Sequence, residues 1–190
     1  MKVIWYGCLL FTICLAVEAD ITSDPNYLKG FKVTSEYEEF ANYRTKFKRI
    51  TDFKNSGLHW QQFVVIYTNT EIYEKNYAEY YRCFVDEDYD EDDDEPPSFV
   101  PYKPGDVIVK ENYADESNTP SIPLTLTIMK KMPAGYDPKY GDWRYIQLNI
   151  EGKTIVDGNS DDASVYGLCI DCHKNIESRD FIFTNHLDQG

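Results

Sequence analysis

Cysteine is scarce in this chain, with five residues among 190. Cys8 and Cys14 lie in an apolar N-terminal stretch, which leaves Cys83, Cys169 and Cys172 beyond it. Small secreted domains that depend on disulfides usually carry more cysteines, and an even number of them. The sequence also contains no Asn-x-Ser/Thr tripeptide, so nothing in it indicates N-glycosylation. We expect Cys83 to be a buried free thiol, with an intermolecular disulfide as the alternative.

Basic side chains are also few, 19 against 33 acidic ones, and the formal net charge is −14. This balance argues against nucleic acid as a partner, because phosphate binding requires an excess of Lys and Arg. The chain is 42% hydrophobic and 15% aromatic, enough for the core of one domain and too much for a disordered tail. Beyond the N-terminus no apolar run approaches the roughly 18 to 20 residues that a membrane span requires.

The N-terminus has the pattern of a signal peptide. Lys2 supplies the positive charge, Val3 to Val17 form the apolar stretch, and small residues precede a cleavage site after Ala19. An uncleaved anchor is the alternative, but the apolar run is short for a span. We therefore predict a signal peptide over residues 1–19 and a secreted or periplasmic protein. A polar lead-in over 20–34 should precede the domain, which we place at 35–187.

Helices are expected at two places. Ser35 and Glu38 have the spacing of a capping box, and four apolar residues follow at helical spacing, namely Phe40, Tyr43, Phe47 and Ile50. A second helix is predicted from Thr70, with tyrosines on one side.

Strands are expected between and after these helices. Residues 60–67 are rich in β-branched and aromatic side chains, residues 107–109 follow a Pro-Gly turn, and residues 124–129 and 145–150 alternate apolar with polar side chains. Together these elements predict an α+β domain in which an antiparallel sheet packs with helices.

One segment interrupts this pattern. Asp86 to Glu95 holds nine carboxylates in ten residues and is followed by two prolines. Such dense like charge favours a solvated insertion, which we place at 86–98. Weak calcium binding through carboxylate oxygens is the functional alternative, although EF-hand spacing is missing.

The most specific motif is Cys169-Ile170-Asp171-Cys172-His173. Two thiols three residues apart lie on one helical turn, and the following histidine can bind iron, which is the attachment pattern of c-type haem. A redox dithiol, a disulfide between Cys169 and Cys172, and a zinc site are the alternatives. Zinc usually requires four ligands and the sequence offers one pair. The motif therefore predicts covalent haem, with His173 as the metal ligand.

The sixth iron position has no strong candidate. The histidines and methionines that could fill it are His59, His186, Met129 and Met132. An open or aromatic-capped distal face is expected instead, and such a face binds small molecules rather than only passing electrons.

The sequence resembles the cytochrome P460 family, which includes the β-sheet cytochromes c′. The resemblance covers roughly residues 36–185, in blocks that follow the family's order. These blocks are residues 56–59 with 67–69, 105–111, 128–131, 135–138 with 141–143, Cys169 to His173, and 179–183.

The resemblance implies a P460-like fold, usually dimeric, with thioether bonds from Cys169 and Cys172 and iron ligation by His173. One branch of the family oxidises hydroxylamine with a haem that a lysine cross-links. The other branch lacks that link and binds NO and CO. For the cross-link the resemblance offers Lys75 and Lys103, with exposed surface lysines as the alternative reading. The distal polar groups of the oxidising branch have no matched position in this sequence, and Arg44 and Glu111 are the residues to test for that role.

Two hypotheses follow. The first is a mono-haem c-type protein that binds hydroxylamine, NO or CO at an open iron, with an unknown redox partner, and that is an oxidoreductase if it is an enzyme. The second is a secreted non-enzymatic binding or matrix protein on the same fold. It would use the acidic loop for calcium and join Cys169 to Cys172 in a disulfide.

Overall fold

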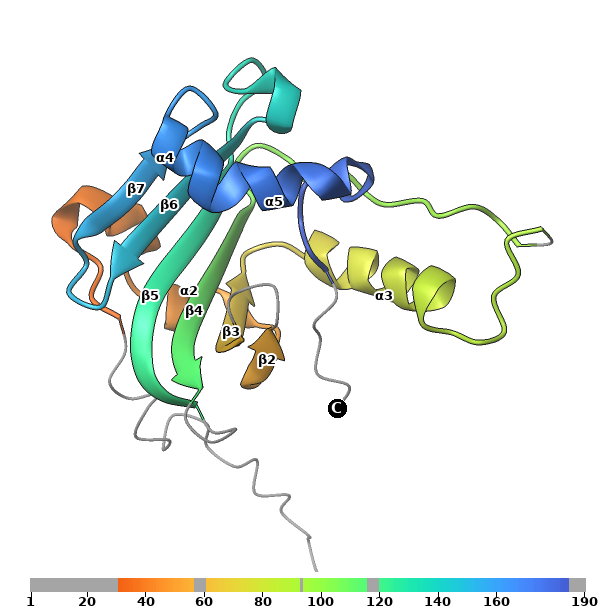
Figure 1. Ribbon diagram of the computed structural model, residues 1–190, viewed down its shortest axis with the longest axis horizontal. Coiled ribbons are helices and arrows are strands. Elements are labelled where there is room, and N and C mark those ends of the chain that lie inside the picture. The colour runs from red at the N-terminus through yellow and green to blue at the C-terminus, as the bar shows by residue number, and fades with distance from the viewer. Residues whose placement is uncertain (1–30, 57–60, 93, 116–119, 185–190) are drawn as a thin grey trace, which may run out of the picture.

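A computed structural model describes residues 31–56, 61–92, 94–115 and 120–184. The proposed signal peptide, His59 and His186 lie outside the described residues. Within them, seven strands form one antiparallel sheet with helices on both faces, which confirms the α+β class (Figure 1). No helix in the described part of the chain is long and apolar enough to cross a membrane.

The sheet has the order β1-β3-β4-β5-β6-β7, with the short β2 also beside β3. Its bounds are β1 (Lys48–Arg49), β2 (Lys54–Ser56), β3 (Gln62–Thr68), β4 (Val107–Asp115), β5 (Pro120–Lys131), β6 (Trp143–Asn149) and β7 (Thr154–Gly158). The long strands β4 and β5 pair Lys110 with Thr127, and β5 and β6 pair Thr127 with Gln147. These three side chains therefore stand in one row on the same face of the sheet.

The N-terminal segment covers one face of the sheet. It contains the 3-10 helix η2 (Ser35–Phe40) and the short helix α2 (Tyr43–Lys46). The continuous helix predicted from Ser35 is therefore wrong, because Ala41 is extended and Asn42 is left-handed, which ends the helical path. The predicted capping box is wrong as well, since the N-cap is Thr34 and its side chain makes no capping hydrogen bond.

Aromatic side chains from this segment nevertheless fill a closed core against the sheet. The core contains Tyr37, Phe40, Tyr43, Val65, Tyr67, Val109, Leu126, Ile128 and Leu148. Phe31, which lies in the segment predicted to be a polar lead-in, is buried in the same core. Burial of these aromatic groups makes the face a substantial source of stability.

The opposite face carries the C-terminal helical segment (Figure 1). After β7 the chain forms α4 (Ala163–Val165), the π-helical turn η5 (Tyr166–Ile170), α5 (Asp171–His173) and the 3-10 helix η6 (Lys174–Arg179). Asp162 caps the start of this segment by accepting hydrogen bonds from the amides of Ser164 and Val165. Val165 and Ile170 are fully buried and hold the segment against the sheet.

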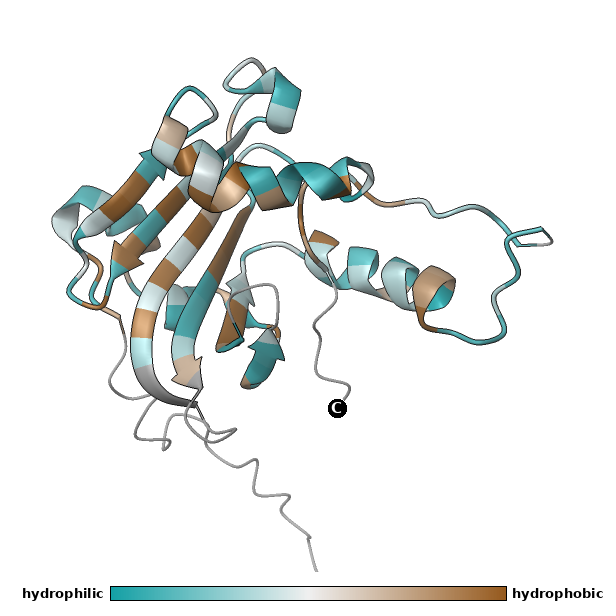
Figure 2. Ribbon diagram, in the orientation of Figure 1, coloured by the Kyte–Doolittle hydropathy of each residue, from teal (hydrophilic) through white to brown (hydrophobic). Residues whose placement is uncertain are grey.

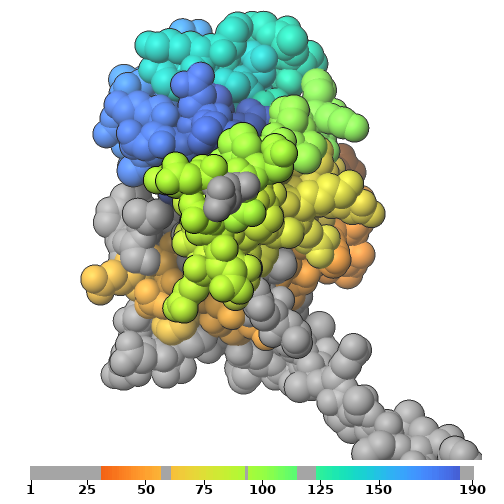
Figure 3. Space-filling view, turned by 90° about the vertical axis from the view of Figure 1, so that its right-hand side faces the viewer, coloured from red at the N-terminus to blue at the C-terminus, as the bar shows by residue number. Residues whose placement is uncertain are grey.

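Helix α3 (Ile72–Phe84) and the acidic insertion form an arm at the side of the sheet. Figure 2 shows the loop of this arm as hydrophilic, whereas β5 alternates between apolar and polar residues. Figure 3 looks at the end of the arm and shows its loop, in green, in front of the rest of the molecule. Cys83 lies in α3 as a buried free thiol, as the sequence predicts.

Candidate functional site

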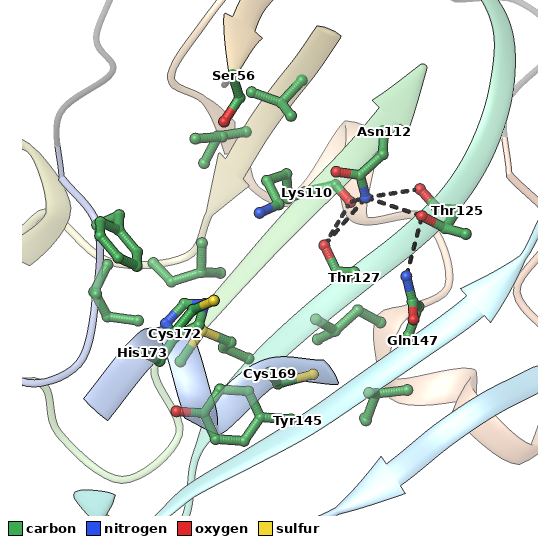
Figure 4. A pocket seen from close by; sticks show the side chains of 18 of the residues that line it. Ser56, Lys110, Asn112, Thr125, Thr127, Tyr145, Gln147, Cys169, Cys172 and His173 are labelled. Atoms are coloured by element: carbon green, nitrogen blue, oxygen red, sulfur yellow. Dashed lines mark hydrogen bonds between the residues drawn. The ribbon is translucent and has the colours of Figure 1, made fainter. Parts of the chain in front are cut away.

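A cavity lies between the sheet and the C-terminal helical segment, and it brings together the three residues of the sequence motif. Cys169, Cys172 and His173 all line it from η5 and α5. Figure 4 shows them on one side of the cavity, opposite the side chains of β4 and β5. The geometry therefore joins two thiols and an imidazole at one hollow, as covalent haem attachment requires.

His173 is held by its neighbours in a defined orientation. Its Nδ1 lies 2.6 Å from the carbonyl oxygen of Phe181, and the rings of Tyr145 and Phe183 flank it at 5.5 and 5.3 Å. A carbonyl oxygen can only accept, so Nδ1 must carry the proton and Nε2 keeps its lone pair. Burial lowers the pKa of His173 to about 4, and the ring is therefore neutral at physiological pH.

The two motif cysteines are free thiols. The disulfide of the second hypothesis is therefore not present in the structure. Burial raises the pKa of Cys169 to about 11, so this thiol is protonated near neutral pH. Redox dithiols rely on a lowered thiol pKa instead, and the environment of Cys169 thus argues against that alternative.

The wall formed by the sheet carries both polar and apolar side chains. The polar ones are Lys110, Asn112, Thr125, Thr127 and Gln147, and the apolar ones include Ile66, Ile108, Met129 and Ile146, to which the C-terminal segment adds Ile182. Asn112 donates from Nδ2 to the carbonyl and hydroxyl oxygens of Thr125 at 3.0 and 3.2 Å (Figure 4). Since a carbonyl only accepts, this contact fixes which way the amide faces.

Lys110 is the lysine of this cavity that sequence reasoning missed. It projects from β4 toward the side on which Cys172 and His173 lie (Figure 4). Burial lowers the pKa of Lys110 to about 7, so a large fraction of its amine is neutral at physiological pH. The sequence carried a signal for it, because Lys110 belongs to a block that resembles the P460 family, but only the strand register shows that it faces the cavity.

Lys75 and Lys103, the lysines expected for a cross-link, do not line this cavity. Lys75 is exposed on α3 with its Nζ 3.7 Å from Glu71, and Lys103 is exposed before β4. Their positions agree with the alternative reading of surface lysines.

Arg44 and Glu111, offered as distal polar groups, lie elsewhere. They form a buried ion pair of 2.6 Å on the closed-core face of the sheet, because Glu111 alternates with its cavity-facing neighbours along β4. Neither side chain lines the cavity, so neither supplies a polar group there.

Among the candidates for a sixth iron ligand, some line the cavity and others do not. Met129 lines the cavity from β5, whereas Met132 does not, and the two remaining histidines lie outside the described residues. Within the described part of the chain no group of three or more His, Cys, Asp or Glu side chains could hold a metal ion.

No protein-family model matches the chain, and no curated protein sequence matches it. Fold and cavity define its class on their own: an α+β protein with an antiparallel sheet and a cavity between the sheet and a Cys-x-x-Cys-His helical segment. What the cavity can bind follows from its side chains. It offers two anchoring thiols, one oriented imidazole, an apolar wall and an amine of lowered pKa.

Proposed function

We propose that the chain is a mono-haem c-type protein of the cytochrome P460 type that binds a small nitrogen species or gas. One observation carries the proposal: the Nδ1 of His173 is engaged by the Phe181 carbonyl in the same cavity that holds Cys169 and Cys172. Metal-binding histidines typically donate their second ring nitrogen to such a partner, which fixes the tautomer and the ring orientation.

Each group of the cavity has a place in this proposal. Cys169 and Cys172 would hold the haem through thioether bonds, and His173 would bind the iron through Nε2. The apolar side chains of Ile66, Ile108 and Ile182 suit a porphyrin face, since they exclude water from it. Bound haem would supply an open coordination position and accept electrons if the ligand is oxidised.

Lys110 supplies proton chemistry on the sheet side of the cavity. Because its pKa is about 7, its amine can take a proton from a bound ligand or return one near neutral pH. Its neutral form is also a nucleophile, so Lys110 replaces Lys75 and Lys103 as our candidate for a covalent link to haem. Forming that C–N bond would remove one hydrogen from the amine and one from a haem carbon, and it would need an external two-electron oxidant such as a peroxide. The branch of the family that oxidises hydroxylamine would carry that link, and the gas-binding branch would not.

The first test is the intact mass of the protein, denatured but not reduced, after production with c-type haem maturation. A mass raised by one haem supports the proposal, because non-covalent cofactors are lost on denaturation. The Cys169→Ala/Cys172→Ala variant is the control and should have the mass of the bare chain. A bare wild-type chain lacking two hydrogens would overturn the proposal in favour of a disulfide and a non-enzymatic binding protein.

A second measurement tests the individual roles. His173→Ala should keep the thioether-bound haem but change the visible spectrum, and an unchanged spectrum would contradict iron ligation by His173. Peptide mapping of the wild type then decides the lysine link. A link would join the peptide with Lys110 to the peptide with Cys169 and Cys172, and Lys110→Arg would abolish it.

A further inference from the structure

The carbonyl that orients His173 belongs to an unusual piece of backbone. Asp180 and Phe181 both have left-handed conformations, with φ of 50° and 64°. Residues with a side chain rarely adopt this region, and two in succession, one of them bulky, need support from their surroundings. The orientation of the Phe181 carbonyl therefore depends on whatever holds these two residues.

The side chain of Asp180 accepts three hydrogen bonds from two donor groups. Lys131 donates from Nζ to both carboxylate oxygens at 2.6 and 2.7 Å, and the backbone amide of Tyr102 donates to Oδ2 at 2.8 Å. The Lys131 and Asp180 side chains are only 11% and 14% exposed. This is a shielded, charge-assisted contact, which is stronger than an exposed ion pair.

The backbone of the same residue is held as well. Trp143 donates from Nε1 to the Asp180 carbonyl at 2.9 Å, and the Lys131 ammonium lies 4.9 Å from the Trp143 ring centre. Gly141 makes room for the turn, because a Cβ there would lie 2.5 Å from a ring carbon of Phe181. Contacts from the end of β5, the start of β6 and the segment before β4 thus converge on one turn.

We infer that Asp180 and Lys131 are positioning residues, which fix the Phe181 carbonyl and thereby keep His173 in the tautomer that leaves Nε2 free to bind. The link is short: Lys131 holds Asp180, Asp180 holds the left-handed turn, and the next carbonyl accepts the His173 proton. The functional benefit of a free Nε2 rests on the proposed function. The hydrogen bonds that fix the tautomer involve only residues of this chain and can be tested without haem. The inference explains why the Lys131–Asp180 ion pair belongs to the same site as the Cys-x-x-Cys-His motif, although both of its residues lie outside that motif.

The test reads the tautomer directly, on the full mature chain made without haem. The sequence has three histidines, so ¹⁵N-labelled histidine gives a simple NMR spectrum. In the wild type, His173 should show almost only the Nδ1–H tautomer. In Asp180→Ala, a substantial Nε2–H population should appear. Asp180→Asn, which keeps one oxygen for the Tyr102 amide, should lie between the two.

A matched control separates this effect from the loss of any ion pair. Asp157→Ala removes the contact of Asp157 with Arg144, which is also 2.6 Å long and partly buried, but Asp157 does not contact the turn. It should leave the His173 tautomer unchanged. If Asp180→Ala does not fold, Lys131→Gln replaces it and should shift the tautomer in the same direction.

The haem-loaded protein gives a second readout. When the Phe181 carbonyl is misplaced, His173 becomes a less basic ligand, so ferric iron is less stabilised and the reduction potential should rise. In the Cys169→Ala/Cys172→Ala background, where haem b binds without thioethers, Asp180→Ala should weaken haem affinity by about 10-fold.

The outcomes distinguish the two proposals. A wild-type chain that takes up no haem would overturn the proposed function and leave the tautomer result standing. A folded Asp180→Ala or Lys131→Gln chain with an unchanged His173 tautomer would overturn the positioning role, whether or not the wild type binds haem.

Discussion

Lys110 and Glu111 are neighbours in sequence, yet the sheet sends them to opposite environments. Lys110 faces the cavity, and Glu111 is fully buried in the closed core. There Glu111 accepts hydrogen bonds from Arg44, Tyr43 and Tyr113. The alternation along β4 thus places one charge where it can act on a ligand and the other where only a fixed network can tolerate it.

This network predicts a large cost when Arg44 is lost. Arg44→Met should lower the free energy of unfolding by about 3 kcal/mol, because it leaves the Glu111 carboxylate buried without its cation. Urea denaturation at pH 7 measures the change. The double variant Arg44→Met/Glu111→Leu should recover most of the loss, since no uncompensated charge then remains. A loss below about 0.5 kcal/mol in the single variant would show that Arg44 contributes little to the stability of the network.

The lowered pKa of Lys110 predicts that the stability of the folded chain depends on pH. Its pKa is about 7 in the folded chain against an ordinary 10.5, so below pH 7 the folded protein bears the full cost of a buried ammonium. Between pH 7 and 10.5 the unfolded chain binds more protons than the folded one, and the cost disappears as pH rises. In the chain made without haem, Lys110→Met should therefore be more stable than the wild type by about 2 kcal/mol at pH 6.

The same advantage should fall to a few tenths of a kcal/mol at about pH 10.5 and vanish above about pH 11.5, where Lys110 is neutral in both states. Denaturation curves of both proteins across this range provide the measurement, and Lys153→Met is the control because Lys153 is exposed. A constant difference at all pH values would mean that packing, not charge, separates the variants.

At the scale of elements, the sequence predicted what local periodicity determines. Alternation identified β5 and β6, and aromatic spacing identified α3, each within a few residues of its observed bounds. It failed at the N-terminal helix because apolar spacing alone cannot reveal the extended Ala41 and the left-handed Asn42. It also gave no sign of β7, a five-residue strand that forms by pairing with β6.

The residues of the candidate site likewise fall into those that a local pattern could predict and those that it could not. Cys169, Cys172 and His173 are local in sequence, so a motif could predict them. Lys110 and the support at Asp180 come from distant segments, and only the strand register and the C-terminal turn bring them to His173. Their roles were not predictable because single-sequence patterns carry no information on which face or turn meets the motif.

The acidic loop beside α3 predicts that the stability of the folded chain depends on salt concentration. The loop holds nine carboxylates, and its repulsion should destabilise the folded chain at low salt. Replacing all six carboxylates in residues 86–92 by Asn or Gln should change stability by less than about 1 kcal/mol at high salt. At about 10 mM salt the variant should melt higher than the wild type, because long-range repulsion is then unscreened.

Thermal melts at low and high salt measure this difference. A variant that loses about 2 kcal/mol or more at both salt concentrations would mean that the loop contributes specific contacts to the fold.

The molecule as a whole is asymmetric about its sheet. One face is a closed core of aromatic and aliphatic side chains, and the other holds the cavity beneath the C-terminal helical segment. Both faces carry a buried hydrophobic cluster, but a ligand in the cavity would add contacts to the cavity face and none to the closed one. Stability should therefore be distributed unevenly, and haem should redistribute it.

Hydrogen exchange tests this asymmetry on the haem-loaded and haem-free chains. Haem should slow exchange by about 10-fold or more in residues 163–179, because the thioethers and the iron bond tie that segment to the cavity. It should leave η2 and α2 nearly unchanged, since they pack on the closed core. The control is Cys169→Ala/Cys172→Ala/His173→Ala, prepared with the same maturation, in which the slowing should disappear. Equal slowing on both faces would show that the sheet opens as a single cooperative unit, and protection confined to η2 and α2 would contradict a ligand in this cavity.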